Sequence, residues 1–176
     1  MGGNDLAPTT LVREIDNSKI TLISFKIGDG LEQNKKLVLY KPPTGWSFTG
    51  DGDGFTLISD GMNTAEVTFE KISPLESAAY NEEQQKTYQR EVQGLVPEGS
   101  DNLAIVSQET NPSGIGGHPT TELIVSYSLF GRPLLMSVFY LNMGDSLLRI
   151  KLVCDKRDFI ATHQTLHQSL HSWTEK

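Results

Sequence analysis

Three strand-like segments run directly into one amphipathic helix over residues 116–173, and this is the clearest hydrophobic pattern in the chain. The connections at residues 131–132 and 143–145 are too short for crossover helices, so the three strands are predicted to be antiparallel neighbours. The middle strand carries apolar side chains on both faces, which predicts a central position in a sheet that is covered on both sides. The predicted strands span residues 120–130, 133–142 and 147–154.

The segment after the third strand has the periodicity of a helix that buries one face. Apolar or aromatic positions recur at alternating spacings of four and three residues, which forms a single stripe on a helix. Asp155 is predicted to be the N-cap, with Asp158 in the first turn. The stripe, which is expected to pack against the sheet, consists of Phe159, His163, Leu166, Leu170 and Trp173.

A second helix is predicted between residues 73 and 94. Ser73 can cap its N-terminus, Pro74 suits the first helical position, and Glu76 can complete a capping box. Gly94 is the predicted stop signal. The middle of this helix, residues 81–90, is almost wholly polar, so most of its surface is expected to face solvent.

The rest of the chain shows the pattern of short strands separated by turns. Residues 65–72 alternate between apolar and polar side chains, as in a strand with one buried face. Asp-Gly pairs at residues 29–30, 53–54 and 60–61 predict hairpin-type turns. The fold class that follows is α+β, an α/β/α sandwich with a central antiparallel sheet flanked by helices. Further strands are predicted at residues 19–27, 36–40, 45–48, 55–59 and 103–107.

Length and charge narrow the range of functions. The 176 residues suffice for one sizeable core, and the sequence predicts a single domain over residues 15–176 after a flexible leader at residues 1–14. A net charge of −7 without a cluster of basic residues argues against nucleic-acid binding. No segment has the roughly 18 consecutive apolar residues of a membrane helix. The compartment stays open between the cytoplasm and, after removal of a signal peptide, the periplasm or the exterior.

Three histidines on the closing helix, His163, His167 and His171, are spaced four residues apart, a spacing that lets helical histidines chelate zinc. They lack the glutamate of an HExxH motif, and the simpler interpretation is one packed and two boundary histidines. Cys154 precedes the helix, where the helix dipole can favour a thiolate. It also shares a strand face with apolar residues, which favours a buried, inert thiol. No catalytic, metal-binding or cofactor-binding residue is therefore assigned.

Two loops resemble ligand-binding motifs only in part. Residues 49–60 echo a calcium-binding loop through Asp51 and Asp53, but the register fails at the other ligand positions, so a hairpin turn is favoured. The glycine-rich residues 114–117 lack the lysine and the Ser/Thr of a phosphate-binding loop and precede a strand. Neither loop is predicted to hold a cofactor.

Pro42, Pro43 and Trp46 form a short segment that combines prolines with an aromatic ring. An aromatic ring beside rigid, extended backbone offers a contact surface that loses little conformational entropy on binding. These residues are therefore candidates for a binding groove. The alternative interpretation is that the tryptophan seals one end of the sheet.

The order of these elements, together with several short segments, resembles the Mog1/PsbP-like fold family. The segments are residues 40–46, residues 116–119 with the following strand at 121–129, residues 130–132 and residues 169–173. The resemblance covers about residues 36–175 and implies an antiparallel sheet flanked by helices. It also implies noncatalytic binding, because the family includes a photosystem accessory protein, a nuclear-transport GTPase partner and bacterial periplasmic or secretion-associated domains.

The sequence favours a noncatalytic binding or accessory domain that holds a protein or a small ligand, because a complete scaffold carries no assembled catalytic set. Two alternatives stay open. One is a metal-assisted hydrolase that uses His163, His167 and His171 on the C-terminal helix, and the other is a chaperone-like module for secretion substrates. No cofactor is predicted, and the sequence identifies neither the partner nor the oligomeric state.

Overall fold

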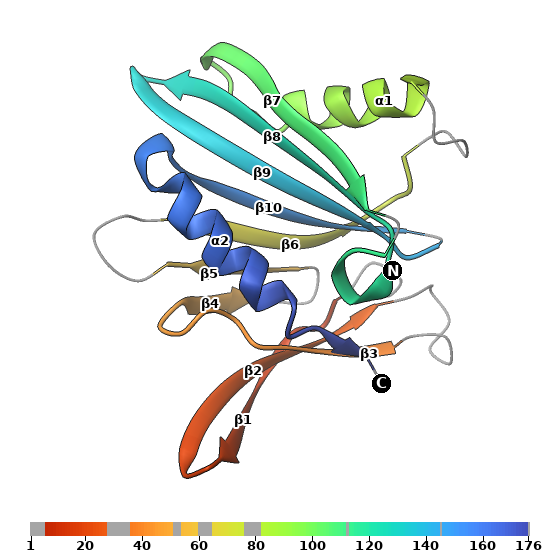
Figure 1. The fold of residues 1–176 in the computed structure, drawn as a ribbon, viewed down its shortest axis with the longest axis vertical. Helices are drawn as coiled ribbons and strands as arrows, with labels where there is room; N and C mark the ends of the chain where they lie inside the picture. Colours follow the sequence, from red (N-terminus) through yellow and green to blue (C-terminus); the bar gives the residue numbers. More distant parts are fainter. Residues whose placement is uncertain are drawn as a thin grey trace.

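The computed structural model describes residues 6–27, 36–50, 54–59, 65–75, 82–111, 113–144 and 146–175 of the chain. These residues form two antiparallel sheets, one of seven strands and one of four (Figure 1). In spatial order, the larger sheet contains β4 (Ser47–Gly50), β5 (Gly54–Ile58), β6 (Glu66–Ile72), β10 (Leu147–Asp155), β9 (Arg132–Asn142), β8 (Thr120–Leu129) and β7 (Asp101–Asn111). The smaller sheet contains β1 (Thr9–Ile15), β2 (Ser18–Ile27), β3 (Lys36–Tyr40) and β11 (Thr174–Glu175).

Two helices cover the larger sheet from opposite sides. α2 (Phe159–Leu170) crosses one face, and α1 (Glu82–Gln93) lies behind β7 and β8 on the other (Figure 1). The predicted α/β/α arrangement is confirmed. Each predicted strand corresponds to one of β2 to β10, although β7 is longer than predicted and pairs with β8 through two register shifts.

The meander formed by β8, β9 and β10 is confirmed, but its first turn lies one residue earlier than predicted. Leu129 pairs with Arg132, so the turn consists of Phe130 and Gly131. Both turn residues have positive φ, 53° and 77°, as in the two-residue hairpin turns that match the right-handed twist of strands. This turn leaves the Phe130 side chain 96% exposed.

Both faces of β9 are buried, as its sequence predicts. Met136 and Val138 belong to the apolar cluster that contains Val92 of α1. Phe139 points the other way and belongs to the cluster that contains Leu166 of α2. The strand therefore lies in the middle layer between the two helices.

The closing helix begins later than predicted. Lys156–Asp158 form a single 3₁₀ turn, and α2 starts at Phe159. The Asp155 side chain makes no cap. Its carboxylate instead accepts hydrogen bonds of 2.6 and 2.8 Å from the Arg132 guanidinium, and these bonds lower the pKa of Asp155. The predicted N-cap is wrong because a charged partner on β9 holds this carboxylate.

The start predicted for the other helix is also wrong. Ser73 and Pro74 are not helical, and the described helix spans Glu82–Gln93; Glu76, the proposed capping-box partner, lies outside the described residues. The stop at Gly94 is confirmed, because the Gly94 backbone N–H donates to a carbonyl of the last helical turn at 3.1 Å. Neither described helix is long and apolar enough to cross a membrane.

The first described residues belong to the smaller sheet. β1 pairs with β2 along its whole length through a tight turn at Asp16 and Asn17, both of which have positive φ. Leu6 is fully buried. Residues 6–14, which the sequence predicts to be part of a flexible leader, thus contain the buried Leu6 and most of β1. Pairing with β2 provides backbone hydrogen bonds to a segment whose own sequence has no periodic signal.

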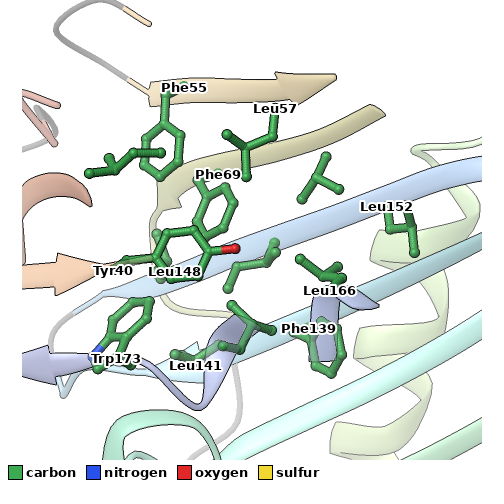
Figure 2. Packing of buried hydrophobic residues seen from close by; sticks show 14 of the residues in the cluster. Tyr40, Phe55, Leu57, Phe69, Phe139, Leu141, Leu148, Leu152, Leu166 and Trp173 are labelled. Atoms are coloured by element: carbon green, nitrogen blue, oxygen red, sulfur yellow. The ribbon is translucent and has the colours of Figure 1, made fainter. Parts of the chain in front are cut away.

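Aromatic rings from both sheets meet in the main core (Figure 2). Phe69 on β6 stacks on Phe55 of β5, with ring centroids 4.3 Å apart, and the ring of Tyr40 on β3 lies 5.5 Å from that of Phe69. Phe25 of β2 and Trp173, which follows α2, meet edge to face at 5.2 Å. These contacts pack the smaller sheet against the larger one.

Candidate functional site

A surface pocket of about 390 Å³ lies between β2 and the loop that connects β3 to β4. Three residues that the sequence analysis names as groove candidates, Pro42, Pro43 and Trp46, line it. This pocket is the proline–tryptophan groove, and its lining consists of Lys19, Ile20, Thr21, Ile23, Lys41, Pro42, Pro43, Thr44, Gly45, Trp46 and Phe48.

The backbone of the loop has a defined turn. The Trp46 backbone N–H donates to the carbonyl of Pro43 at 3.3 Å, and Gly45 has φ of 86°. Positive φ at this position is the requirement of a type II turn, and glycine meets it without strain. The turn places the Trp46 ring beside the two prolines, whose own φ angles are fixed by their rings.

The C-terminal part of α2 holds the start of this loop. The hydroxyls of Tyr40 and Ser169 are hydrogen bonded at 2.6 Å. The Ser172 hydroxyl accepts a bond from the Lys41 backbone N–H at 2.8 Å. Burial raises the pKa of Tyr40, so its hydroxyl keeps its proton at neutral pH. These bonds hold the start of the loop in place, which lowers the entropic cost of ordering it on binding.

A second cavity, of about 260 Å³, lies on the α2 face of the larger sheet and is the histidine cleft. Its floor is the β7–β8 pair, one wall is α2, and the other wall is the glycine-rich loop that precedes β8. Glu109 and Glu122 lie directly opposite each other on the two strands. The cleft is lined by Glu109, Thr110, Asn111, Ser113, Gly114, Ile115, Thr120, Glu122, Phe139, His167, Leu170 and His171.

The three helical histidines differ in their surroundings. His163 is not part of the cleft lining; its ring stacks between Phe159 and Phe139, with centroid distances of 5.0 and 6.0 Å. His167 and His171 line the cleft, and their rings meet edge to face at 5.0 Å. Burial, followed by the neighbouring His171, lowers the pKa of His167, so His167 is neutral at physiological pH.

Glu122 joins β8, β9 and α2 through two short hydrogen bonds. Its Oε2 accepts a bond of 2.6 Å from the Ser137 hydroxyl and lies 2.5 Å from His163 Nε2. The carboxylate therefore stands between the serine and the histidine, whereas activation of a serine nucleophile requires the base to contact the hydroxyl. Ser137 is also fully buried. This cluster acts as packing support for α2.

The histidine spacing does not lead to an assembled metal-ligand set in the described part of the chain. Among those residues, no three His, Cys, Asp or Glu side chains are grouped so that they could hold a metal ion. The rings of His163 and His167 are stacked, with centroids 6.2 Å apart. Their nitrogens therefore do not converge as ligands of one ion would.

The glycine-rich loop packs against the end of the chain. Gly116 has φ of 62°, and a Cβ atom built there would lie 2.5 Å from Cδ1 of Trp173. His118 Nε2 lies 2.6 Å from the Glu175 carboxylate, which also accepts a bond of 2.9 Å from the Trp173 indole N–H. The lack of a side chain at Gly116 thus allows the loop to pack closely on Trp173.

Replacing Gly116 with alanine is expected to lower the free energy of unfolding by about 1–3 kcal/mol, because the new methyl group would clash with the buried Trp173 ring. Urea denaturation measures the change. Gly117→Ala is the matched control, since Gly117 also has positive φ but has no heavy atom within 4 Å of the added Cβ. Equal losses in the two variants would show that backbone conformation, and not the contact with Trp173, sets the cost.

No protein-family model matches the chain, and no curated protein matches it either. Solved structures do match. The Ran-binding protein Mog1p of Saccharomyces cerevisiae is 8% identical, with a TM-score of 0.57 over 86% of this chain and 94% of that chain. PA94 of Pseudomonas aeruginosa, a protein of unknown function, is 11% identical, with a TM-score of 0.54 over 95% of this chain and 97% of that chain. The chain has the Mog1/PsbP-like fold.

Two segments on which the sequence resemblance rests are neighbours in this Mog1/PsbP-like structure. Residues 40–46 form the loop of the proline–tryptophan groove, and residues 169–173 hold that loop through Ser169 and Ser172. At these low identities the matches establish the fold alone.

Cys154 is buried on the core side of β10 in the Mog1/PsbP-like sheet. Burial, together with the nearby Asp158 and Asp155 carboxylates, raises the pKa of Cys154 to about 11. The side chain is therefore a thiol at neutral pH, and the helix dipole does not produce the thiolate that a cysteine nucleophile needs.

The ligand positions of the hypothetical calcium loop fall outside the described residues, which omit Asp51, Asp53 and Asp60. Its flanks are the antiparallel strands β4 and β5, in which Gly50 pairs with Phe55. The flanks are those of a hairpin, in contrast to the helices that surround an EF-hand loop.

Sequence reasoning missed the polar groups that position both cavities. Glu122, Glu175 and Ser172 make contacts to partners 41, 57 and 131 residues away in sequence, and no local spacing marks such pairs. Lys19 in the groove lining was missed for the same reason. The one available signal was the position of Glu122 in a strand predicted to pair with the central strand, where a buried acidic residue needs a partner.

Proposed function

We propose that the chain is a noncatalytic protein-binding domain that uses the proline–tryptophan groove to hold a segment of its partner. The observation that carries this proposal is the groove itself, in which Trp46 and Phe48 lie beside Pro42 and Pro43 on a loop held by α2. Aromatic side chains in preorganised pockets supply most of the binding free energy in protein interfaces.

One comparison adds support. Mog1p, which shares the fold, is named a Ran-binding protein. A protein-binding role for this chain is consistent with that neighbour, whereas the partner itself does not transfer at 8% identity.

The other two hypotheses have weaker support. A metal-assisted hydrolase would need convergent histidines, and His163 instead stacks between two phenylalanines and contacts Glu122. A chaperone-like module would need a long apolar surface for an unfolded chain. The groove, of about 390 Å³, has the size of a site for a short segment.

The test is affinity purification from the organism that produces the protein, with wild-type and Trp46→Ala baits. A specific partner is expected with the wild-type bait and not with the variant. With the purified partner, calorimetry should show an increase in Kd of about tenfold or more for Trp46→Ala, since truncation of an aromatic anchor commonly costs over about 1.4 kcal/mol.

Two further variants separate the groove from the fold. Thr44→Trp places a bulky ring at an exposed position of the groove wall and should also weaken binding without loss of core contacts. Phe130→Ala removes an aromatic ring that is 96% exposed and outside the groove, and should leave Kd unchanged. A partner that binds all four proteins equally, or a protein that turns over a substrate without any partner, would refute the proposal.

A further inference from the structure

We propose that the segment held in the proline–tryptophan groove is acidic, with a carboxylate within reach of Lys19 and Lys41 and an apolar side chain against Trp46. This inference rests on the protein-binding function proposed above and adds the chemistry of the partner. It follows from the sign of the charges around the groove, the apolar surface inside it and the net charge of the whole chain.

The charges in the groove lining are both positive. Lys19 and Lys41 are its charged residues, and both are exposed, whereas the chain carries a net charge of −7. On the neighbouring strand β1, Glu14 lies opposite Lys19 and therefore on the same face of the sheet, whereas the next residue, Arg13, lies opposite Ile20 and points to the other face. Glu14 thus offsets one of the two positive charges, and the groove keeps a net positive charge. The local charge therefore favours an anionic group, in contrast to the rest of the surface.

The groove also has an apolar interior, with which an anionic group by itself would make no favourable contact. Trp46 and Phe48 are partly buried against the main core. The rest of the apolar lining consists of Ile20, Ile23, Pro42 and Pro43. An apolar side chain that covers the Trp46 ring would remove both surfaces from water. Thr21 and Thr44 offer hydroxyls that can bond to the backbone of an extended segment.

The net charge of the chain distinguishes a short acidic segment from a larger polyanion. A nucleic acid or an anionic membrane would bring many charges close to a protein of net charge −7, and repulsion acts over about 10 Å at ordinary salt. A short protein segment brings one or two carboxylates to the lysines and leaves the other surfaces in solvent. The geometry therefore fits an acidic peptide segment best.

The experiment follows Trp46 fluorescence during titration with three short peptides. Each peptide carries one central phenylalanine, which is flanked by glutamates, by lysines or by serines. Trp173, the other tryptophan, is 6% exposed and serves as a constant background. The glutamate peptide is expected to bind about tenfold more tightly than the lysine peptide, and its affinity should fall as salt is raised.

Charge reversal provides the matched control. Lys19→Glu combined with Lys41→Glu should invert the preference, so that the lysine peptide binds more tightly. Lys86→Glu combined with Lys156→Glu changes the net charge equally at exposed positions outside the groove and should leave the preference intact. Equal binding of all three peptides, no binding of any of them, or binding only to vesicles that contain phosphatidylserine would overturn the inference.

The two proposals fail in different ways. If a purified partner loses affinity with Trp46→Ala but binds the Lys19→Glu, Lys41→Glu protein normally, the protein-binding function stands and the acidic segment is rejected. If no partner depends on Trp46, both proposals are rejected. If the charge reversal weakens the partner about as much as Trp46→Ala does, both are supported.

Discussion

The Phe69→Ala variant is expected to lose about 3–5 kcal/mol of unfolding free energy, the largest effect of any single truncation considered for this chain. Phe69 is fully buried, and its ring stacks on Phe55 at 4.3 Å and lies 6.2 Å from Phe25 and 5.5 Å from Tyr40. These neighbours come from both sheets, so they cannot close around the space without shifting one sheet against the other. The cost therefore includes a cavity as well as lost burial.

Chemical denaturation with two probes tests this expectation. Tryptophan fluorescence reports on Trp46 and Trp173, and circular dichroism reports on the sheets; coincident transitions are required for a two-state value. Phe130→Ala is the matched control, because it makes the same substitution at a residue that is 96% exposed and should change stability by less than about 0.5 kcal/mol. A similar loss in both variants would mean that the aromatic cluster does not join the sheets.

The second large effect is expected from Arg149→Ala, at about 2–4 kcal/mol. Arg149 donates to Glu91 of α1 at 2.5 Å and to Glu70 of β6 at 3.2 Å. Glu91 also accepts a bond from the Tyr140 hydroxyl. The side chains of Arg149 and Glu91 are only 14% and 18% exposed, so removal of the guanidinium leaves a carboxylate that is largely shielded from water. The remaining exposure keeps the expected loss somewhat below that of a fully buried pair.

A double-variant cycle distinguishes an ion-pair effect from a packing effect. Arg149→Met with Glu91→Gln removes both charges and retains a hydrogen-bond partner for Tyr140, so the double variant should lose clearly less than the sum of the two single variants. Arg132→Met breaks the pair with Asp155 on the same sheet, where the Arg132 side chain is 61% exposed and that of Asp155 14%. It should cost less than Arg149→Met, because a guanidinium that stays in solvent gains less from pairing than a shielded one. Strict additivity in the cycle would contradict the proposed role of the pair.

The strands of the larger sheet were predictable because each has a recognisable pattern in its own local sequence. β9 has apolar side chains on both faces, which indicates a central position in the sheet. The short connections before and after it indicate that its two neighbours are antiparallel to it. The groove loop was predictable for a similar reason, since Pro42, Pro43 and Trp46 are adjacent in sequence. A site formed by residues that are adjacent in sequence can be recognised from the local sequence.

The parts that could not be predicted depend on distant partners. β1 forms because β2 pairs with it, and Asp155 fails as a cap because Arg132, 23 residues away, binds it. Lys19 reaches the groove only because β2 lies beside the β3–β4 loop. Local propensity is a weak guide wherever tertiary contacts compete with it.

The pairing of the chain's last described residues with its first third has a consequence for biosynthesis. β11 pairs with β3, and Trp173 packs on Phe25 of β2. β3 therefore lacks one of its two neighbours, and Phe25 lacks the ring that covers it, until residue 175 emerges from the ribosome. Domains usually fold as translation proceeds, but here the pairing of β3 with β11 must wait until residue 175 has been synthesised. Until then Phe25 of β2 lacks the cover of the Trp173 ring, and transiently exposed apolar surface of this kind favours aggregation of a nascent chain.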